Sequence, residues 1–145
     1  MRYLLDTNHW SYVQERNPAV IAHVSGLPDD AELFMSVVSQ AELLGGIELV
    51  AGERRRRELS GLYREAVEAA TDLLPIASEE ARHFARIYAE LRRRGKAIDT
   101  NDMWIAATAR AHRLTVVSND QHFQYVDGIE VEDWSKLDGS GAHTA

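Results

Sequence analysis

The alternation of short apolar runs with longer amphipathic stretches constrains the fold of this chain more than any other feature. A first short strand is predicted to end at Asp6, and extended segments are predicted over residues 33–38, 74–76, 114–117 and 129–132. Between these segments, apolar residues recur at the spacing of one helix face. Strands that alternate with helices build a parallel sheet covered by helices on both faces. The predicted fold class is therefore α/β.

Capping residues and glycines indicate where the helices begin and end. A helix over residues 18–25 is expected to follow the Asn17 cap and to stop at Gly26. Ser39 is expected to cap a helix that carries Glu42 in its first turn. Further helices are predicted from near Glu53, from Ser78 to Gly95, and from near Asp99 to His112.

Composition limits the classes of protein that fit. The 145 residues are expected to form one domain, residues 1–137, followed by a flexible C-terminal tail, residues 138–145. The absence of cysteine excludes disulfide scaffolds and thiolate zinc sites, and it fits a reducing cytosol. No stretch approaches the ~18 apolar residues of a membrane span. We therefore expect a cytoplasmic protein that makes no membrane contact.

The charge balance excludes one class of nucleic-acid binder. Sixteen lysines and arginines stand against 23 aspartates and glutamates, a net charge of −7. A protein that holds nucleic acid through overall positive charge is therefore excluded. Two local basic runs, Arg54 to Arg57 and Arg92 to Lys96, are either solvated helix faces or phosphate-binding surfaces.

Acidic residues occur where predicted strands end or where the following helices begin. Asp6 and Asp120 follow strands, and Glu42 and Asp102 lie in the first turns of helices. We call these residues, Asp6, Glu42, Asp102 and Asp120, the four acids. Ligands of open parallel sheets bind outside the carboxyl ends of the strands. The four acids are therefore expected to meet at one edge of the sheet.

Each acid taken singly has a simpler structural explanation. Asp6 and Asp120 are placed to cap a helix or a turn, and Ser39 with Glu42 matches a capping box. Asp99 is either the cap of the helix that presents Asp102 or an outer metal ligand. Only the joint pattern favours a functional site.

Carboxylates brought together repel one another, and a divalent cation removes that repulsion. Oxygen ligands without histidine or cysteine indicate Mg²⁺ or Mn²⁺. Such a centre suits phosphodiester hydrolysis, because the metal acidifies a bound water and neutralises charge on the phosphate. We expect Asp6 and Asp102 to be inner ligands, with Glu42 and Asp120 completing a second metal site or orienting the water.

Four ordered segments resemble the PIN-domain ribonucleases and, among them, the VapC toxins of bacterial toxin–antitoxin pairs. The segments are Leu4-Leu5-Asp6-Thr7-Asn8, then Ser39-Gln40-Ala41-Glu42-Leu43-Leu44-Gly45-Gly46-Ile47, then Asn101-Asp102-Met103-Trp104-Ile105-Ala106-Ala107-Thr108-Ala109, and Val116-Val117-Ser118-Asn119-Asp120-Gln121-His122-Phe123, with a closing Glu132-Asp133-Trp134. The four acids match the family's acidic positions. Ser118 stands where threonine is common, and it keeps the hydroxyl.

The resemblance implies a three-layer α/β/α domain with a short central parallel sheet. It also implies Mg²⁺- or Mn²⁺-dependent cleavage of RNA that leaves a 5′-phosphate and a 3′-hydroxyl. A small cognate antitoxin would block the site, and homodimers or toxin–antitoxin hetero-oligomers are expected. We place the antitoxin helix in a groove between the helix bearing Glu42 and the helix that starts near Glu53, because that region is rich in leucine.

Two other functions compete with a ribonuclease. A catalytically silent PIN-like module would bind RNA or protein without cutting, but it has no reason to bear the electrostatic cost of clustered acids. A phosphatase with an aspartate nucleophile after its first strand is the other. Asp6 is followed by Thr7 and Asn8, so the second aspartate two places on that this chemistry uses is missing.

Overall fold

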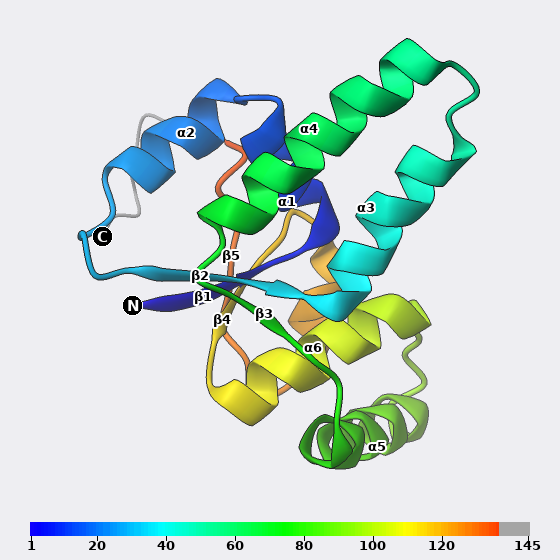
Figure 1. Ribbon diagram of the computed structural model, residues 1–145. Coiled ribbons are helices and arrows are strands. Elements are labelled where there is room, and N and C mark those ends of the chain that lie inside the picture. Colours follow the sequence, from blue (N-terminus) through cyan, green and yellow to red (C-terminus); the bar gives the residue numbers. More distant parts are fainter. Residues whose placement is uncertain (137–145) are drawn as a thin grey trace.

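Five parallel strands form the central layer of the molecule, described by a computed structural model over residues 1–136 (Figure 1). The strands are β1 (Arg2–Leu5), β2 (Glu32–Ser36), β3 (Asp72–Leu74), β4 (Thr115–Val117) and β5 (Val131–Glu132). They lie in the order β3-β2-β1-β4-β5. The short central parallel sheet expected from the sequence is therefore confirmed.

Six α-helices cover the two faces of the sheet, four on one side and two on the other (Figure 1). The first layer contains α1 (Thr7–Gln14), α2 (Pro18–Ser25), α3 (Val37–Leu49) and α4 (Glu53–Ala69), and the second contains α5 (Ser78–Arg93) and α6 (Thr100–His112). A short 3-10 helix, η1 (Gln121–Tyr125), follows β4. The chain is a three-layer α/β/α domain, as predicted.

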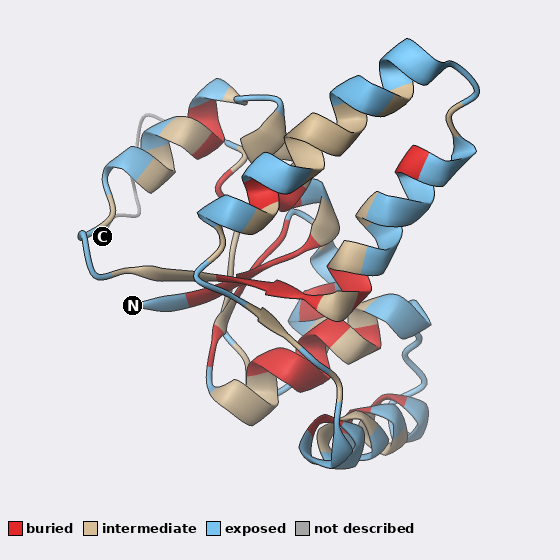
Figure 2. Cartoon of the chain, viewed as in Figure 1, coloured by how far each residue is buried: buried red, intermediate tan, exposed pale blue. Residues whose placement is uncertain are grey.

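Alternating side chains of β1 build a separate hydrophobic core on each face of the sheet. Leu4 packs with the α5 and α6 side, whereas Tyr3 and Leu5 pack with α1, α2 and α4. Figure 2 shows burial concentrated on the inner strands and on the inward face of α6. Ala106, Ala107 and Ala109 have no exposed surface, because small side chains allow α6 to approach the sheet closely.

The strand register aligns the carboxyl ends of the central strands. Leu5 is paired with Met35 on β2 and with Val117 on β4. The order of the strands reverses about β1, since β2 and β3 lie on one side and β4 and β5 on the other. Such a reversal point is where open parallel sheets bind ligands. The residues that follow Leu5, Ser36 and Val117 therefore define the place to look for a site.

Some element boundaries differ from the sequence-based expectations. The cap of α3 is Ser36, whose hydroxyl accepts a hydrogen bond from the Val38 N–H at 2.9 Å, and Ser39 is buried within the helix. Glu42 consequently lies in the second turn, so both its expected position and its capping-box role were wrong. The extended segment expected over residues 74–76 is β3, two residues earlier. The proposed flexible tail, residues 138–145, lies outside the described residues.

Among residues 1–136, no helix is both long enough and apolar enough to cross a membrane.

Candidate active site

Asp6 lies directly after β1 and caps the next helix. Its Oδ1 accepts a hydrogen bond from the His9 N–H at 2.8 Å, which satisfies a free donor in the first turn of α1. Its own N–H donates to the Val117 carbonyl at 3.0 Å, so the backbone is fixed between β1 and β4. The side chain is buried, although a carboxylate is costly to bury. Asp6 therefore caps α1, which was the simpler of the two explanations that the sequence offered.

Glu42 reaches the site from α3 and is held by two other elements. Its Oε1 accepts a hydrogen bond from the Thr7 hydroxyl, and its Oε2 accepts one from Asn101 Nδ2 at 3.3 Å. The Thr7 oxygen also lies 3.0 Å from the Ser39 hydroxyl. These contacts join the first turns of α1 and α6 to α3. Glu42 therefore connects three helices and does not form the capping box that was its alternative explanation.

Asp102 lies in the first turn of α6 and is half-buried. Burial raises its pKa from 3.8 to about 6, and the negative charges of Asp120, Asp99, Asp6 and Glu42 add to the rise, in that order. A helix N-terminus normally favours a charged carboxylate. The acidic neighbours and the loss of water outweigh that effect here. Asp102 therefore stands at the electrostatic centre of the four acids.

Asp120 follows β4 and caps η1. Its Oδ1 accepts a hydrogen bond from the His122 N–H at 2.9 Å and lies 3.0 Å from the His122 ring nitrogen Nδ1. Its N–H donates to the buried Ser118 hydroxyl at 2.9 Å. The hydroxyl of Ser118 thus shapes the turn that presents Asp120.

Asp99 acts as the N-cap of α6. Its Oδ2 accepts a hydrogen bond from the Asn101 N–H at 3.2 Å. The sequence left two roles open for Asp99, a helix cap or an outer metal ligand. The structure shows the cap.

The four acids gather at one edge of the sheet, but they do not form a finished ligand set. Among residues 1–136, no three histidine, aspartate or glutamate side chains lie close enough to share one metal ion as they stand. One oxygen of Asp6 and one of Asp120 cap helices, whereas the other oxygen of each accepts no hydrogen bond from residues 1–136. The same is true of both Asp102 oxygens. In kind, these oxygen donors fit Mg²⁺ or Mn²⁺.

His9 is a residue of this region that the sequence analysis did not single out. It is fully buried, and its Nδ1 lies 3.2 Å from Asp6 Oδ1. His9 occupies the third position of α1, where the glutamate of a capping box reaches back toward the N-cap. An Asp-x-x-His sequence after an apolar strand was the signal that could have identified it.

Family comparison agrees with this geometry. The PIN domain model matches residues 3–129, from within β1 to just before β5. The chain therefore belongs to the PIN domain family.

Two relatives and one solved structure show which group of PIN domain proteins this chain resembles. The chain is 35% identical over 136 residues to Ribonuclease VapC2 of Haemophilus influenzae, covering 92% of this chain and 98% of the relative. It is 30% identical over 136 residues to the tRNA(fMet)-specific endonuclease VapC of Shigella flexneri, covering 93% and 99%. DNA-bound VapBC from Salmonella typhimurium superposes with a TM-score of 0.76 at 27% identity, covering 92% and 98%. Within the PIN family, the chain is one of the VapC proteins.

Proposed function

We propose that this protein is a metal-dependent endoribonuclease that acts as the toxin of a VapBC-type toxin–antitoxin pair. One observation carries the chemistry: burial, together with the negative charges of four other carboxylates, raises the pKa of Asp102 to about 6. Such a concentration of negative charge is unfavourable unless a cation joins it. The ribonuclease names of its relatives support RNA as the substrate.

Each of the four acids has a distinct role in this proposal. Asp6 and Asp102 would hold Mg²⁺ or Mn²⁺ through the oxygens that accept no hydrogen bond from the protein. Glu42, fixed by Thr7 and Asn101, and Asp120, fixed by the turn at Ser118, would complete a second site or orient the attacking water. The four acids come from four separate segments of the chain.

A bound divalent cation supplies an acidified water and neutralises the charge that develops on the phosphate and on the leaving oxygen. The residues of the chain do the positioning. The Asp102 carboxylate accepts no hydrogen bond from residues 1–136, so it is the acid that can turn toward an ion held by the others. Cleavage would leave a 5′-phosphate and a 3′-hydroxyl.

An apolar groove beside the four acids would receive the antitoxin. It lies between α1, α3 and α4, has a volume of about 350 Å³, and includes Thr7 and Glu42 at its acidic end. Its apolar walls are Leu43, Ile47, Leu59 and Leu62. Leu44 and Leu49, two other leucines of this leucine-rich region, are exposed and do not line the groove. An amphipathic helix would bury its apolar face there and bring a cationic side chain to the acids.

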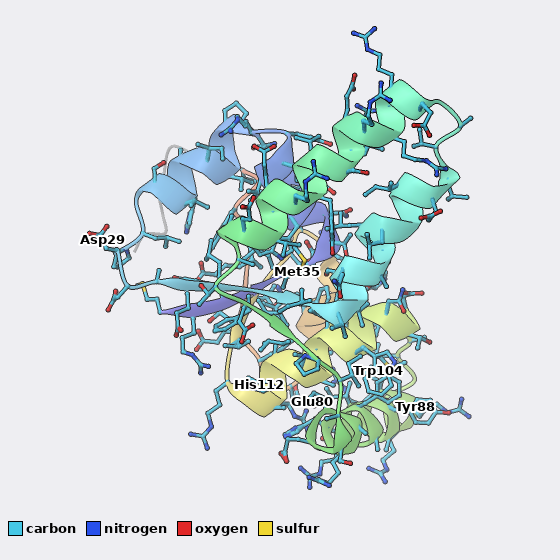
Figure 3. The ribbon with its side chains drawn as sticks, in the orientation of Figure 1. Asp29, Met35, Glu80, Tyr88, Trp104 and His112 are labelled. Atoms are coloured by element: carbon cyan, nitrogen blue, oxygen red, sulfur yellow. The ribbon has the colours of Figure 1, made fainter. Side chains whose placement is uncertain are left out.

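RNA cleavage by the purified protein tests the proposal. We expect cleavage with Mg²⁺ or Mn²⁺, none with EDTA, and a loss of at least about 100-fold in Asp6→Asn and in Asp102→Asn, the size typical of removing a group that stabilises developing charge. Asp29→Asn is the matched control, because this exposed acid lies before β2, at the opposite edge of the sheet (Figure 3). It should cut RNA as the wild type does.

One observation favours the alternative, a catalytically silent module that binds RNA or protein. Among residues 1–136, no three acidic or histidine side chains lie close enough to share a metal ion. RNA binding without cleavage in every divalent metal tried would support that alternative. Persistent cleavage by Asp6→Asn would instead indicate a contaminating nuclease. Expression from the native operon tests the partner: recovery of the toxin alone, with no bound small protein, would contradict the antitoxin assignment.

A further inference from the structure

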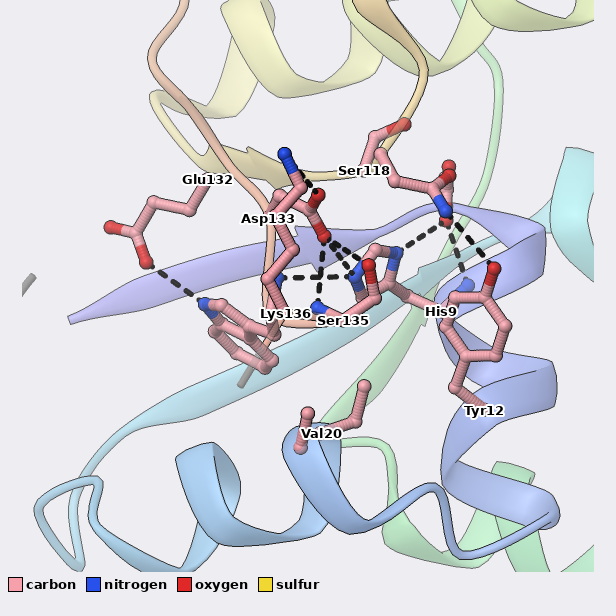
Figure 4. A network of polar contacts seen from close by, with 12 residues as sticks. His9, Tyr12, Val20, Ser118, Glu132, Asp133, Ser135 and Lys136 are labelled. Carbon is pink, nitrogen blue, oxygen red and sulfur yellow. Dashed lines mark hydrogen bonds and ion pairs between the residues drawn. The ribbon is translucent and has the colours of Figure 1, made fainter. Parts of the chain in front are cut away.

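We propose that His9 is a positioning residue that fixes the carboxylate of Asp6 from behind, and that the segment after β5 in turn fixes His9. The inference rests on the proposed function, because it assigns a purpose to holding Asp6 still. Figure 4 shows the network around His9, which lies beside the segment that contains Glu132, Asp133, Ser135 and Lys136. One ring nitrogen of His9 contacts Asp6 and the other contacts the backbone of Trp134.

The two ring nitrogens of His9 have different partners. Nε2 lies 3.3 Å from the backbone N–H of Trp134, which can only donate, so Nε2 accepts. A neutral imidazole carries one proton, which must then be on Nδ1. Nδ1 lies 3.2 Å from Asp6 Oδ1 and donates to it. The Trp134 backbone therefore selects the tautomer that binds Asp6.

Asp133 also lies near the ring without competing for it. Its Oδ1 is 3.5 Å from His9 Nε2, but it accepts hydrogen bonds from the N–H and the hydroxyl of Ser135, at 2.8 Å and 2.6 Å. The carboxylate is thus satisfied within its own turn, and its second oxygen lies 3.9 Å from Lys136 Nζ. The neutral form of His9 is consistent with every contact in the network.

Both donors from His9 bind the same oxygen of Asp6. The backbone N–H and the ring Nδ1–H meet Oδ1, at 2.8 Å and 3.2 Å, and so oppose rotation of the carboxylate. Oδ2 is left without a protein donor from residues 1–136 and is the atom available to an ion. A hydrogen-bonded partner that orients a ligating carboxylate typically changes metal affinity by about 10–100-fold.

His9 itself has little freedom to move. It is fully buried and packs edge-to-face on Tyr12, with ring centroids 5.2 Å apart. Trp134 is anchored by a hydrogen bond from its indole N–H to Glu132 Oε1 at 2.9 Å and by stacking on His23 at 4.5 Å. The segment around Trp134 therefore supports Asp6, which lies near the start of the sequence, through His9.

The tautomer is tested on the wild-type protein without reference to activity. In ¹⁵N NMR spectra, we expect His9 Nδ1 to be protonated and Nε2 to be unprotonated, the reverse of the tautomer that is more common in free histidine. A proton on Nε2 would overturn the inference, because Nδ1 could then not donate to Asp6.

Metal binding tests the positioning role. Mn²⁺ alone is titrated calorimetrically into the wild type, His9→Leu and His9→Asn. We expect His9→Leu to bind Mn²⁺ about 10-fold more weakly. His9→Asn, whose amide can replace the Nδ1 donor, should restore most of that loss. In RNA cleavage, His9→Leu should need more Mg²⁺ for half-maximal rate, while the rate at saturating Mg²⁺ changes little.

His112→Leu is the matched control. His112 also binds a carboxylate, Glu80, at 2.7 Å between α5 and α6, but it lies at the far end of α6 from Asp102 (Figure 3). Its loss should lower the melting temperature without changing Mn²⁺ affinity. Equal Mn²⁺ affinity in folded His9→Leu and wild type would overturn this inference alone. Failure of the wild type to bind Mn²⁺ and cut RNA would overturn the proposed function and, with it, this role.

Discussion

The hydroxyl of Thr7 donates a hydrogen bond to Oε1 of Glu42, and it thereby joins the first turn of α1 to the second turn of α3. The two residues follow neighbouring strands of the sheet, β1 and β2. Glu42 is otherwise an exposed side chain on a helix surface. The hydrogen bond from Thr7 therefore restricts the Glu42 side chain, which burial does not restrict.

Removing this hydroxyl should reduce RNA cleavage while leaving the fold intact. A hydrogen bond to a charged group contributes about 1.5–3 kcal/mol, so Thr7→Val is expected to lower kcat/KM by about 10-fold or more, whereas Thr7→Ser should retain most of the activity. In a Glu42→Gln background, Thr7→Val should have little further effect. An equal loss in Thr7→Ser and Thr7→Val would show that the hydroxyl is not what matters.

Asp102→Asn should stabilise the metal-free protein while it abolishes cleavage. The raised pKa of Asp102, about 6 against 3.8, means that the folded state binds more protons than the unfolded state between these values. Stability therefore falls as pH rises from about 4 to about 6. After allowance for solvent screening of a half-buried carboxyl, we expect a gain of about 1 kcal/mol at pH 7.5.

Thermal unfolding with EDTA measures this gain, which corresponds to about 3 °C in melting temperature. At a pH below the ordinary range of aspartate, Asp102 is protonated in both states, and the difference between the variant and the wild type should vanish. Destabilisation by Asp102→Asn at pH 7.5 would contradict the electrostatic reading of the site.

Divalent metal should stabilise the protein more at pH 7.5 than at pH 5. An ion competes with the proton on Asp102, which is mostly bound at pH 5 because the pKa is about 6. With Mn²⁺ at 100 times its dissociation constant, the gain at pH 7.5 should be about 2.7 kcal/mol. Urea unfolding at the two pH values, with Mn²⁺ and with EDTA, measures it. The same gain at both pH values would place the ion away from Asp102.

A side chain added at Gly46 should block the antitoxin. Gly46 lines the groove, and a Cβ there meets no atom within 4 Å. Gly46→Gln is expected to weaken antitoxin binding by about 10-fold or more, since extra atoms forced into well-packed apolar contacts cost about 1–3 kcal/mol. Gly45→Gln is the control, because Gly45 is equally open but lies outside the groove.

Both variants replace a glycine within α3 and should be folded and at least as stable as the wild type. Calorimetric titration with the proposed cognate antitoxin distinguishes the two variants. If the two substitutions weakened antitoxin binding equally, the antitoxin would not bind in this groove.

Local signals in the sequence were sufficient for most of the fold. Asn17 caps α2, which spans Pro18–Ser25 as predicted, and Asp99 caps α6. Asp120 also caps a short helix, η1, as its position after a strand indicated. These features depend on neighbouring residues in the chain, so the sequence contains all that is needed to predict them.

The start of α3 shows where local signals fail. Either Ser36 or Ser39 could cap this helix. The sequence pattern favoured Ser39 as the cap, because Glu42 follows it three residues later, as in a capping box. Ser36 caps the helix because the pairing of β2 with β1 and β3 fixes where the strand ends and α3 begins. Glu42 is thereby freed from a capping role and is held instead by Thr7 and Asn101.

By itself, the sequence determined the alternation of strands and helices, the three-layer class and the identity of the four acids, because periodicity, caps and residue chemistry are local properties. Only the tertiary structure decided which groups touch: Asp102 among four other carboxylates, and His9 between Asp6 and Trp134. Those contacts join positions up to 125 residues apart. They exist because the parallel register aligns the carboxyl ends of β1, β2 and β4, which no short stretch of sequence can specify.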